Sequence, residues 1–412
     1  MPKTLHVGVD VAMKTLAACF VDDQGKALHT IKTMPNSPAG ARQIQQQIAR
    51  LCQQDCFELV RVGTEATSVY DLHVLEYLLE AGSGAAVPLS LYRINPRLIK
   101  HFKLCSTEGS KTDSIDAFFI ADYVRFKPLL RPYSTQSGLL PLQRLTRFRR
   151  SIVKNIAAET NRLLATIFLH MPGIVQQKPM DPRAPTMAAI TGEYLTPEQL
   201  LATPLEELAA LVAGHARNGV DPDDAARAIR EAARDSFHIT PALADALRII
   251  EATSVANIRA MKKSLQSIDA QIEKSLAAFP NTLRTVKGIG PVFAAGLMAE
   301  IGDIRNYVSP DKLAKRAGLV WNQHDSGSFT AEDTHLTTAA NRHLRYYLVE
   351  AANSLRIHNE EYARYYQRKF NEVRDHQHRR ALVLTARKFV RLVFALLKDG
   401  RIYLPNRASQ QP

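Results

Sequence analysis

Four acidic side chains in the first third of the chain have the types and spacing of a metal-binding oxygen cluster. Asp10 interrupts the hydrophobic run of residues 7–11, where a lone carboxylate is costly to bury unless it is paired or binds a cation. Glu65 ends a later strand pattern, and Asp113 and Asp116 share one face at the start of a predicted helix. Such a set suits Mg²⁺ or Mn²⁺. Two such ions about 4 Å apart can activate a nucleophile and stabilise the leaving oxygen when a phosphodiester is cleaved.

Each of these acids also has an explanation that needs no metal. Acidic residues at a helix start, such as Asp113 and Asp116, offset the helix dipole and cap free N–H groups. A glutamate at a strand end, such as Glu65, is commonly just solvated. Asp10, with apolar neighbours on both sides, is the hardest to explain in this way. Because all four acids fall on the expected elements of one fold, we favour the metal site.

The elements that must position these acids alternate between strands and helices. Strand patterns cover Leu5–Val11, Thr15–Asp22, Lys26–Thr33, Phe57–Thr64 and Val87–Ile94, and helical patterns cover Ala41–Cys52, Val69–Ala81, Pro96–Phe102 and Thr112–Phe126. Three antiparallel-type strands followed by an αβαβα order are typical of a ribonuclease-H-like fold. We therefore predict an α/β fold of this kind for the first block.

The remainder of the chain has helical patterns only. Leu139–Leu169 and Pro241–Phe279 are long enough to pair as a helical hairpin or coiled-coil arm. Pro172–Thr196 has the composition of a linker, and Pro197–Phe237 that of short broken helices. Residues from Leu283 onward form helices around a polar loop. We expect three domains: 1–130, 131–280 with an inserted helical subdomain at about 172–240, and 281–412.

The charge of the chain is concentrated in two blocks. The net charge is +13 and the isoelectric point is near 9.6, which favours a polyanionic partner. Residues 1–125 are neutral, 126–180 carry +8, 181–280 carry −4 and 281–412 carry +9. No stretch has the length of a membrane span, and no signal peptide is evident. The four cysteines lack paired spacing, so we expect a reducing cytoplasm.

Several basic and glycine residues are candidates for nucleic-acid contact. The turn that contains Lys287, Gly288 and Gly290 has the signature of a helix-hairpin-helix element, whose backbone N–H groups can approach a phosphate. Arginines with interleaved tyrosines suit phosphate contacts and base stacking. The same features also occur in a plain glycine turn and on solvated helix faces. The candidates are Lys287, Gly288, Gly290, Arg147, Arg150, Lys154, Arg345, Arg368 and Arg387.

The motifs around the four acids resemble one known family. Val7–Ala12, Glu65–Tyr70, Asn95-Pro96 and Lys111–Ala117 are similar in order and spacing to the DEDD transposases of insertion sequences. These are bridge-RNA-guided serine recombinases with a RuvC-like N-terminal domain. The resemblance implies a RuvC-like fold for the first domain, with divalent metal coordinated by Asp10, Glu65, Asp113 and Asp116.

The resemblance also gives a role to a serine in the polar loop of the C-terminal block. Taken alone, a Ser-Gly pair in such a loop indicates a turn. Family members place their catalytic serine in this motif before an Asn-x-x-Leu-Arg helix, and Ser326 matches that position, with Asn341 and Arg345 downstream. The implied role is attack on a DNA phosphate to give a covalent phosphoserine, for which the hydroxyl needs a base or a metal ion. Ser328 is a competing nucleophile.

The implied protein is a DNA transposase or recombinase that cuts and rejoins the strands of an insertion sequence. The resemblance implies Mg²⁺ or Mn²⁺ as cofactor, donor and target DNA as partners, a bridge RNA as guide, and a homo-oligomer, as a dimer of dimers. We expect a cytoplasmic, nucleoid-associated prokaryotic protein. One alternative is a metal-dependent nuclease like the Holliday-junction resolvases, with water as nucleophile. Another is a non-catalytic nucleic-acid-binding protein, which the intact set of four acids disfavours.

Overall fold

The computed structural model describes residues 3–66, 69–82, 86–105, 112–128, 130, 132–133, 139–193, 196–215, 220–321, 325–326, 329–330, 336–337 and 340–404. The chain divides into two compact units, Met1–Ser137 and Gly138–Pro412, each with its own hydrophobic cores. The division into three domains at 131 and 281 stays a prediction. In the described ranges, no helix is both long and apolar enough to cross a membrane.

The first unit is built on a five-stranded mixed sheet with the order β3-β2-β1-β4-β5. β1 pairs antiparallel with β2 and parallel with β4, β2 pairs antiparallel with β3, and β4 pairs parallel with β5. The strands are β1 (Thr4–Val11), β2 (Thr15–Val21), β3 (Ala27–Pro35), β4 (Leu59–Glu65) and β5 (Leu89–Ile94). This order and pairing confirm the predicted ribonuclease-H-like fold.

Helices pack on both faces of this sheet. They are α1 (Pro38–Asp55), α2 (Leu72–Gly82), α3 (Pro96–Lys103) and α4 (Asp113–Phe126). Alternate residues of β1 point to opposite faces, so Leu5, Val7 and Val9 join the core under α1 and α2. Gly8 points to the other face, where α4 packs against β1, β2 and β4.

Two glycines let α4 approach the sheet closely. Gly8 and Gly63 are partners in the β1–β4 pairing and lie under α4. A Cβ atom at Gly8 would lie 2.0 Å from the carbonyl oxygen of Ala117, and one at Gly63 would lie 2.5 Å from a methyl group of Val124. Side chains at these two positions would therefore displace the helix that carries Asp113 and Asp116.

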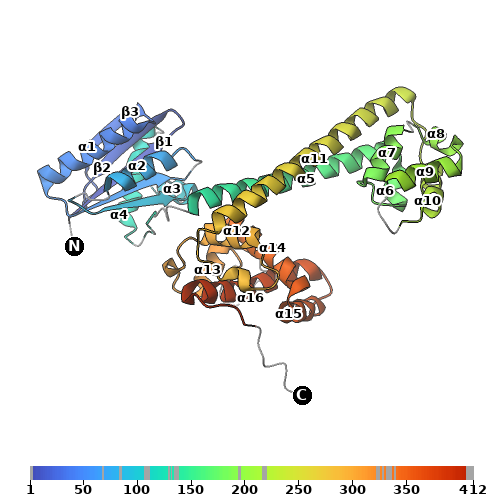
Figure 1. Cartoon of the computed structure of the whole chain (residues 1–412). Helices are drawn as coiled ribbons and strands as arrows, with labels where there is room; N and C mark the ends of the chain where they lie inside the picture. The colour runs from blue at the N-terminus through green and yellow to red at the C-terminus, as the bar shows by residue number, and fades with distance from the viewer. Residues whose placement is uncertain are drawn as a thin grey trace, which may run out of the picture. The chain divides into compact units, whose positions relative to one another are not determined.

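The second unit contains the predicted pair of long helices. α5 (Leu139–His170) and α11 (Pro241–Leu276) pack against each other, as the predicted helical hairpin requires (Figure 1). The Arg149 guanidinium donates to both carboxylate oxygens of Asp269, with Nε to Oδ1 at 2.5 Å. A fully buried pair, His170 and Glu251, joins the two helices at 2.9 Å. Polar contacts thus fix the register along the apolar seam.

The segment between α5 and α11 corrects one expectation. Residues 172–196 do not form a linker: they contain α6 (Pro172–Gln177) and α7 (Pro185–Glu193). Proline at the first helical turn fits without strain, so Pro172 begins α6. Met187 and Ile190 are fully buried in a core that residues of the neighbouring helices share. The expected short helices follow as α8 (Pro197–Ala202), α9 (Leu205–His215) and α10 (Pro222–Arg234).

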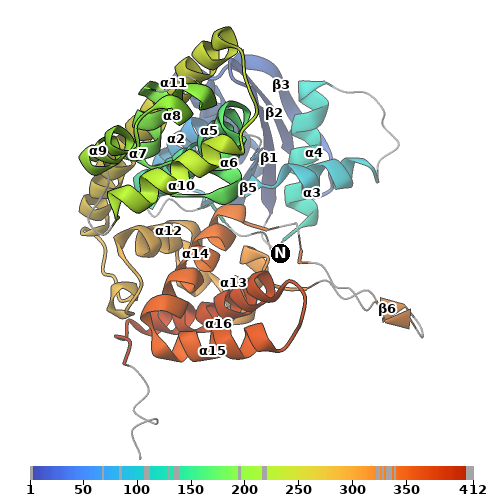
Figure 2. The same ribbon diagram turned by 90° about the vertical axis from the view of Figure 1, so that its right-hand side faces the viewer.

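The C-terminal part of the second unit is a helical bundle around Tyr347 and Leu348, both fully buried. The helices α14 (Arg342–His358), α15 (Glu360–Asn371) and α16 (Gln377–Asp399) pack side by side (Figures 1 and 2). The polar loop expected to lack strands contains a two-residue ladder, β6 (Asp325–Ser326) with β7 (Phe329–Thr330). The helices are η1 (Leu283–Thr285), α12 (Pro291–Ile301), η2 (Ile304–Asn306), α13 (Pro310–Ala317), α14 (Arg342–His358), α15 (Glu360–Asn371) and α16 (Gln377–Asp399).

Candidate active site

Two of the predicted acids lie at the same edge of the sheet. Asp10 is the penultimate residue of β1, and Glu65 is the last residue of β4. Because β1 and β4 run parallel, their carboxyl ends meet at one edge. Both side chains are half-buried. Asp10 follows Gly8 by two residues and therefore lies on the face that α4 covers.

The other two acids lie in the first turn of α4. Thr112 caps this helix, because its Oγ1 accepts a hydrogen bond from the backbone N–H of Ile115 at 3.3 Å. The cap fixes where the helix begins and so where Asp113 and Asp116 stand. Asp113 is exposed and Asp116 is half-buried.

The four carboxylates form one electrostatic cluster. Burial, followed by repulsion from Asp116 and Asp113, raises the pKa of Asp10 to about 6. Burial also raises the pKa of Glu65, and the charges of Asp10 and Asp116 act in the same direction. Asp10 thus lies within electrostatic reach of Asp113 and Asp116, and Glu65 within reach of Asp10 and Asp116.

A lysine that the sequence analysis did not single out lies among these acids. Lys103, the last residue of α3, places its Nζ 2.5 Å from Oδ1 of Asp116. Its positive charge also opposes, without overcoming, the rise in the pKa of Asp10 and of Glu65. In the sequence, a lysine in the last turn of a short helix indicates only a favourable interaction with the helix dipole.

A fifth acid near the same strands is already neutralised. Asp71 is 2 % exposed and accepts two hydrogen bonds from Arg93, at 2.5 Å from Nε and 2.8 Å from Nη2. It also accepts a hydrogen bond from Thr64 Oγ1 at 3.3 Å. These contacts account for its buried charge, so Asp71 is a structural residue and not a fifth ligand candidate.

The four acids have the donor atoms that a hard divalent cation prefers, but their carboxylates do not converge on a single position. All four groups are carboxylates, which Mg²⁺ and Mn²⁺ prefer, and their mutual repulsion favours a cation among them. Within the described ranges, however, no three His, Cys, Asp or Glu side chains are placed to hold an ion as they stand. Asp116 is held by Lys103 instead.

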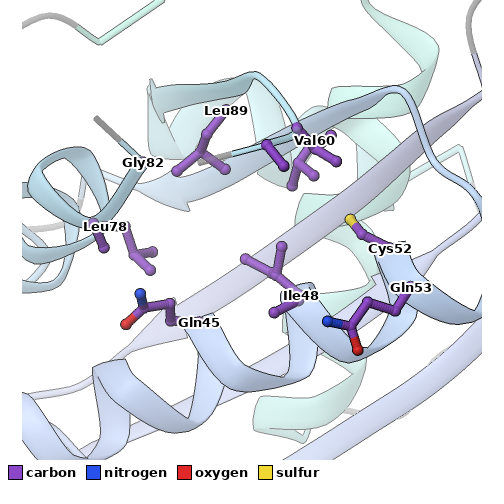
Figure 3. Close-up of a pocket in the computed structure, with 12 residues that line it drawn as sticks. Gln45, Ile48, Cys52, Gln53, Val60, Leu78, Gly82 and Leu89 are labelled. Atoms are coloured by element: carbon purple, nitrogen blue, oxygen red, sulfur yellow. The ribbon is translucent and has the colours of Figure 1, made fainter. Parts of the chain in front are cut away.

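A separate apolar pocket of about 340 Å³ lies on the other face of the sheet (Figure 3). Ile48 and Cys52 of α1, Leu78 of α2, and Val60 and Leu89 of the sheet line it. None of its lining residues is acidic. The candidate site is therefore the open carboxylate edge, not this pocket.

In the second unit, Ser326 is the last residue of β6 and pairs with Phe329 of β7. Its backbone is described, while Gly327 and Ser328 lie outside the described residues. The assignment of Ser326 as nucleophile therefore stays a prediction.

The chain segments on either side of this loop are tied together by Arg345. Its Nε donates to the carbonyl of Ala317 at 3.0 Å, and its Nη2 donates to the carbonyl of Thr337. Gly318 has a φ of +70°, and a Cβ atom there would lie 1.9 Å from Arg345 Nη2. The backbone N–H of Thr337 in turn donates to Val320 at 3.1 Å. Arg345 thus connects the end of α13 to the segment before α14.

A buried network also anchors the start of α14. Asn341 caps this helix through hydrogen bonds from the backbone N–H groups of His343 and Leu344. Its Nδ2 donates to Glu300 Oε2 at 2.8 Å. The Glu300 side chain is 0 % exposed and accepts two further hydrogen bonds from Arg147, at 2.6 and 2.8 Å. Helices α5, α12 and α14 are joined through this one carboxylate.

Four of the predicted nucleic-acid contacts therefore have observed partners within the chain. Arg147 binds Glu300, and Arg345 binds two carbonyls. Arg150 donates to the Arg342 carbonyl at 2.9 Å and lies over the Tyr346 ring at 4.7 Å. Arg387 donates to the Leu319 carbonyl at 2.7 Å. These bonds explain the four arginines without nucleic acid, and their contact with nucleic acid stays a prediction.

The neighbour of Arg150 is electrostatically unusual. His343 lies 3.2 Å from a guanidinium nitrogen of Arg150. Burial lowers the pKa of His343 to about 4, and Arg147, Arg150 and Arg342 act in the same direction against Glu300. His343 is therefore neutral near pH 7 and can accept a hydrogen bond from Arg150.

The other predicted contacts are more accessible. Lys154, Lys287, Gly290 and Arg368 are exposed, and a Cβ atom at Gly290 would meet open space. Gly288 differs, because it has a φ of +100° and its carbonyl accepts a hydrogen bond from Ser354 Oγ at 2.7 Å. Gly288 thus packs the predicted hairpin turn against α14, whereas Gly290, the residue directly before α12, faces open space.

Comparison with known proteins gives relatives over nearly the whole chain. The chain is 27% identical over 407 residues to the insertion element IS116 44.8 kDa protein of Streptomyces clavuligerus, covering 97% of this chain and 96% of the relative. It is 25% identical over 399 residues to the insertion element IS900 42 kDa protein of Mycobacterium paratuberculosis, covering 93% of this chain and 96% of the relative.

One structural likeness concerns the first unit. A structure titled T. thermophilus RuvC in complex with Holliday junction substrate matches 32% of this chain and 100% of that chain, with 18% identity and a TM-score of 0.25. The ribonuclease-H-like assignment itself rests on the strand order and pairing of the sheet.

Two family models match the segments that hold the candidate residues. The IS110 DEDD transposase model, described as a transposase, matches residues 7–172, which include all four acids. A second model, described as the transposase IS116/IS110/IS902 family, matches residues 281–367, which include Ser326 and Arg345. Together the matched segments make up more than half of the chain. The chain therefore belongs to the IS116/IS110/IS902 family of insertion-sequence transposases.

Proposed function

We propose that this transposase cuts and rejoins DNA strands through a serine nucleophile, assisted by divalent metal at the carboxylate edge of its first unit. The observation that carries the proposal is the placement of four carboxylates at the ends of β1 and β4 and in the first turn of α4, on a ribonuclease-H-like sheet. It occurs in a chain of a transposase family whose second matched segment contains a candidate serine. DNA of the element and of its target is the proposed substrate.

Asp10, Glu65, Asp113 and Asp116 would hold the divalent cation, as Mg²⁺ or Mn²⁺. When bound, such an ion stabilises negative charge on the oxygens of a phosphate undergoing displacement. The carboxylates themselves supply charge and position: Asp10 and Glu65 from the carboxyl ends of parallel strands, Asp113 and Asp116 from a capped helix. Gly8 keeps that helix against the sheet.

Ser326 is the proposed nucleophile. Its Oγ would form a bond to a DNA phosphorus while the bond from that phosphorus to a deoxyribose oxygen breaks. The serine hydroxyl gives up its proton and the leaving oxygen gains one, so the products are a phosphoserine linked to one DNA end and a free hydroxyl on the other. Attack by a hydroxyl of a second strand reverses the step and restores the serine, which conserves the phosphodiester bond.

Recombination requires several DNA strands to be held together, and we propose a homo-oligomer, as a dimer of dimers, for this task. A bridge RNA that pairs with donor and target DNA is proposed to select the sites. The exposed basic residues of the second unit, among them Lys154, Lys287 and Arg368, are the proposed contacts to these polyanions.

The test uses the purified full chain with labelled DNA of the element end, the RNA transcribed from the flanking DNA, and Mg²⁺. We expect a protein–DNA adduct that survives denaturing electrophoresis. Ser326→Ala should reduce it by roughly 10⁴-fold or more, because the proposed nucleophile is lost. Ser328→Ala is the matched control and should retain it. Asp113→Asn should lower the adduct yield in Mg²⁺ by at least roughly tenfold.

Other products would contradict the proposal in distinct ways. An adduct that persists in Ser326→Ala but disappears in Ser328→Ala would move the nucleophile by two residues. Free 5′-phosphate ends from both serine variants would indicate water as nucleophile, as in a resolvase-like nuclease. Full activity of Asp113→Asn, together with full activity in excess EDTA, would show that the four acids do not form a required metal site. Equal activity without the RNA would show that the RNA is not a guide.

A further inference from the structure

Lys103 occupies the acid cluster from a neighbouring helix. α3 packs against α4, and the Lys103 ammonium lies 2.5 Å from Asp116 Oδ1. Both side chains are partly shielded, with 26% of Lys103 and 22% of Asp116 exposed. The ammonium also lies 5.9 Å from the centre of the Phe119 ring, one turn further along α4. It is therefore held at one position of the cluster and not spread into solvent.

The contact between Lys103 and Asp116 offsets part of the negative charge of the four acids. Four carboxylates at one edge repel each other, and repulsion from two of them reaches Asp10. Lys103 opposes that repulsion at both Asp10 and Glu65 while it binds Asp116 directly. Lys103 thus interacts electrostatically with three of the four acids, as a metal ion bound between them would.

We propose that Lys103 is an internal counter-ion that holds Asp116 in the metal-free protein and must give up that carboxylate when a divalent cation binds. Lys103 thereby sets the affinity of the site for metal. This inference rests on the proposed function, because it takes the four acids as the metal site.

Competition follows from the distances. A Mg²⁺ ion lies about 2.0–2.1 Å from a carboxylate oxygen that ligates it. An ammonium 2.5 Å from the same oxygen would then stand beside a second positive charge, and the two cations repel. If the ion takes this oxygen, the Lys103 side chain must therefore move away from it.

The chain offers a matched control on the same helix. Lys100 lies one turn before Lys103 in α3 and is exposed. Lys100→Met removes the same charge from the same helix as Lys103→Met, and methionine keeps the unbranched apolar stem in both cases. A general effect of net charge on metal affinity will appear in both variants, and an effect of the Asp116 contact only in the second.

The experiment is a titration of the full chain with Mn²⁺, followed by calorimetry and by the electron paramagnetic resonance of free Mn²⁺. We expect Lys103→Met to bind Mn²⁺ roughly three- to tenfold more tightly than the unmodified chain, and Lys100→Met to stay within about twofold. Lys103→Gln should behave as Lys103→Met, which protects the result against a folding defect in one variant. In EDTA, Lys103→Met should melt at a lower temperature than the unmodified chain, and saturating Mn²⁺ should abolish or reverse this difference.

Three results would overturn the inference. Unchanged or weaker Mn²⁺ binding by both Lys103 variants, with normal binding by the unmodified chain, would show that Lys103 does not compete, while the proposed metal site would stand. Equal tightening by Lys100→Met would reduce the effect to net charge. If neither the unmodified chain nor any variant bound Mn²⁺, the inference and the metal part of the proposed function would fail together.

Discussion

Asp10 makes the metal-free protein sensitive to pH. The folded protein binds a proton on Asp10 more tightly than the unfolded chain does, because its pKa is about 6 in place of the usual 3.8. Between these values the folded state carries more protons, so metal-free stability falls as the pH rises from about 4 to about 6. Asp10→Asn removes this penalty and should raise the free energy of unfolding by about 1–2 kcal/mol at pH 7.5, a value reduced for partial solvent screening.

Urea unfolding in EDTA at pH 4.5 and pH 7.5 measures this effect. The gain from Asp10→Asn should be fully present at pH 7.5 and fall to about a third of that value at pH 4.5. A variant that is less stable than the unmodified chain at pH 7.5 would contradict the electrostatic account of the site. Glu65 is shifted in the same direction and should contribute with the same sign.

The sequence identifies the acids of the site but not the groups that balance them. Asp10 stands out because a carboxylate within an apolar strand demands an explanation. Lys103 and Arg93 do not, because a basic residue on a short helix or an edge strand is ordinary. Their roles come from contacts across the fold: Lys103 reaches Asp116 and Arg93 reaches Asp71. Pattern alone cannot supply such tertiary pairings.

At the level of elements, Arg345 is expected to matter for stability more than for DNA affinity. Arg345→Met would leave the carbonyls of Ala317 and Thr337 without their side-chain donor. We expect a loss of about 1–3 kcal/mol in the free energy of unfolding, because two part-buried carbonyls lose their hydrogen bonds. Arg342→Met, on the same helix but exposed, is the control and should change stability by less than about 0.5 kcal/mol.

Chemical denaturation measures the stability of Arg345→Met and of the control Arg342→Met. Duplex DNA binding over a range of salt concentrations measures their phosphate contacts. If Arg345 contacts DNA as the sequence suggested, Arg345→Met will reduce the salt slope by about one. If its role is the one seen in the structure, the slope will stay unchanged while stability falls. Arg345→Lys should rescue little, because lysine cannot span two carbonyls with a planar fork.

Element patterns predict the frame of the fold better than its irregular parts. The strand order of the first unit and the pairing of α5 with α11 follow from periodicity and length. The content of proline, methionine and alanine in residues 172–196 predicts a linker. Two of those prolines begin helices instead, and buried residues such as Met187 join a core shared with the neighbouring helices. Composition does not distinguish a helix-starting proline from a helix-breaking one.

At the scale of the whole molecule, the positive charge is partly used inside the fold. Arg147 and Arg149 of the +8 segment bind Glu300 and Asp269. Tyr365 on α15, in the +9 segment, has three cations around its ring, namely Arg368 at 5.2 Å, Lys369 at 5.8 Å and Lys388 at 4.8 Å. Lys369 and Lys388 also pair with Glu372 and Glu361, at 2.6 and 2.7 Å, while Arg368 is exposed. The exposed arginine beside this aromatic ring makes the α15 surface the stronger candidate for nucleic-acid contact.

This predicts a difference between two pairs of arginines. Arg364 and Arg368 are exposed on α15, one turn apart and next to Tyr365. Replacing both with glutamine should weaken binding to duplex DNA of random sequence several-fold. It should also reduce the slope of log affinity against log salt concentration by about one for each phosphate contact that is lost.

The control pair, Arg227 and Arg234 on α10, is also exposed but lies in the −4 segment. Its replacement removes the same charge and should leave the slope unchanged. If both double substitutions reduced the slope equally, net charge, and not the α15 surface, would govern DNA binding.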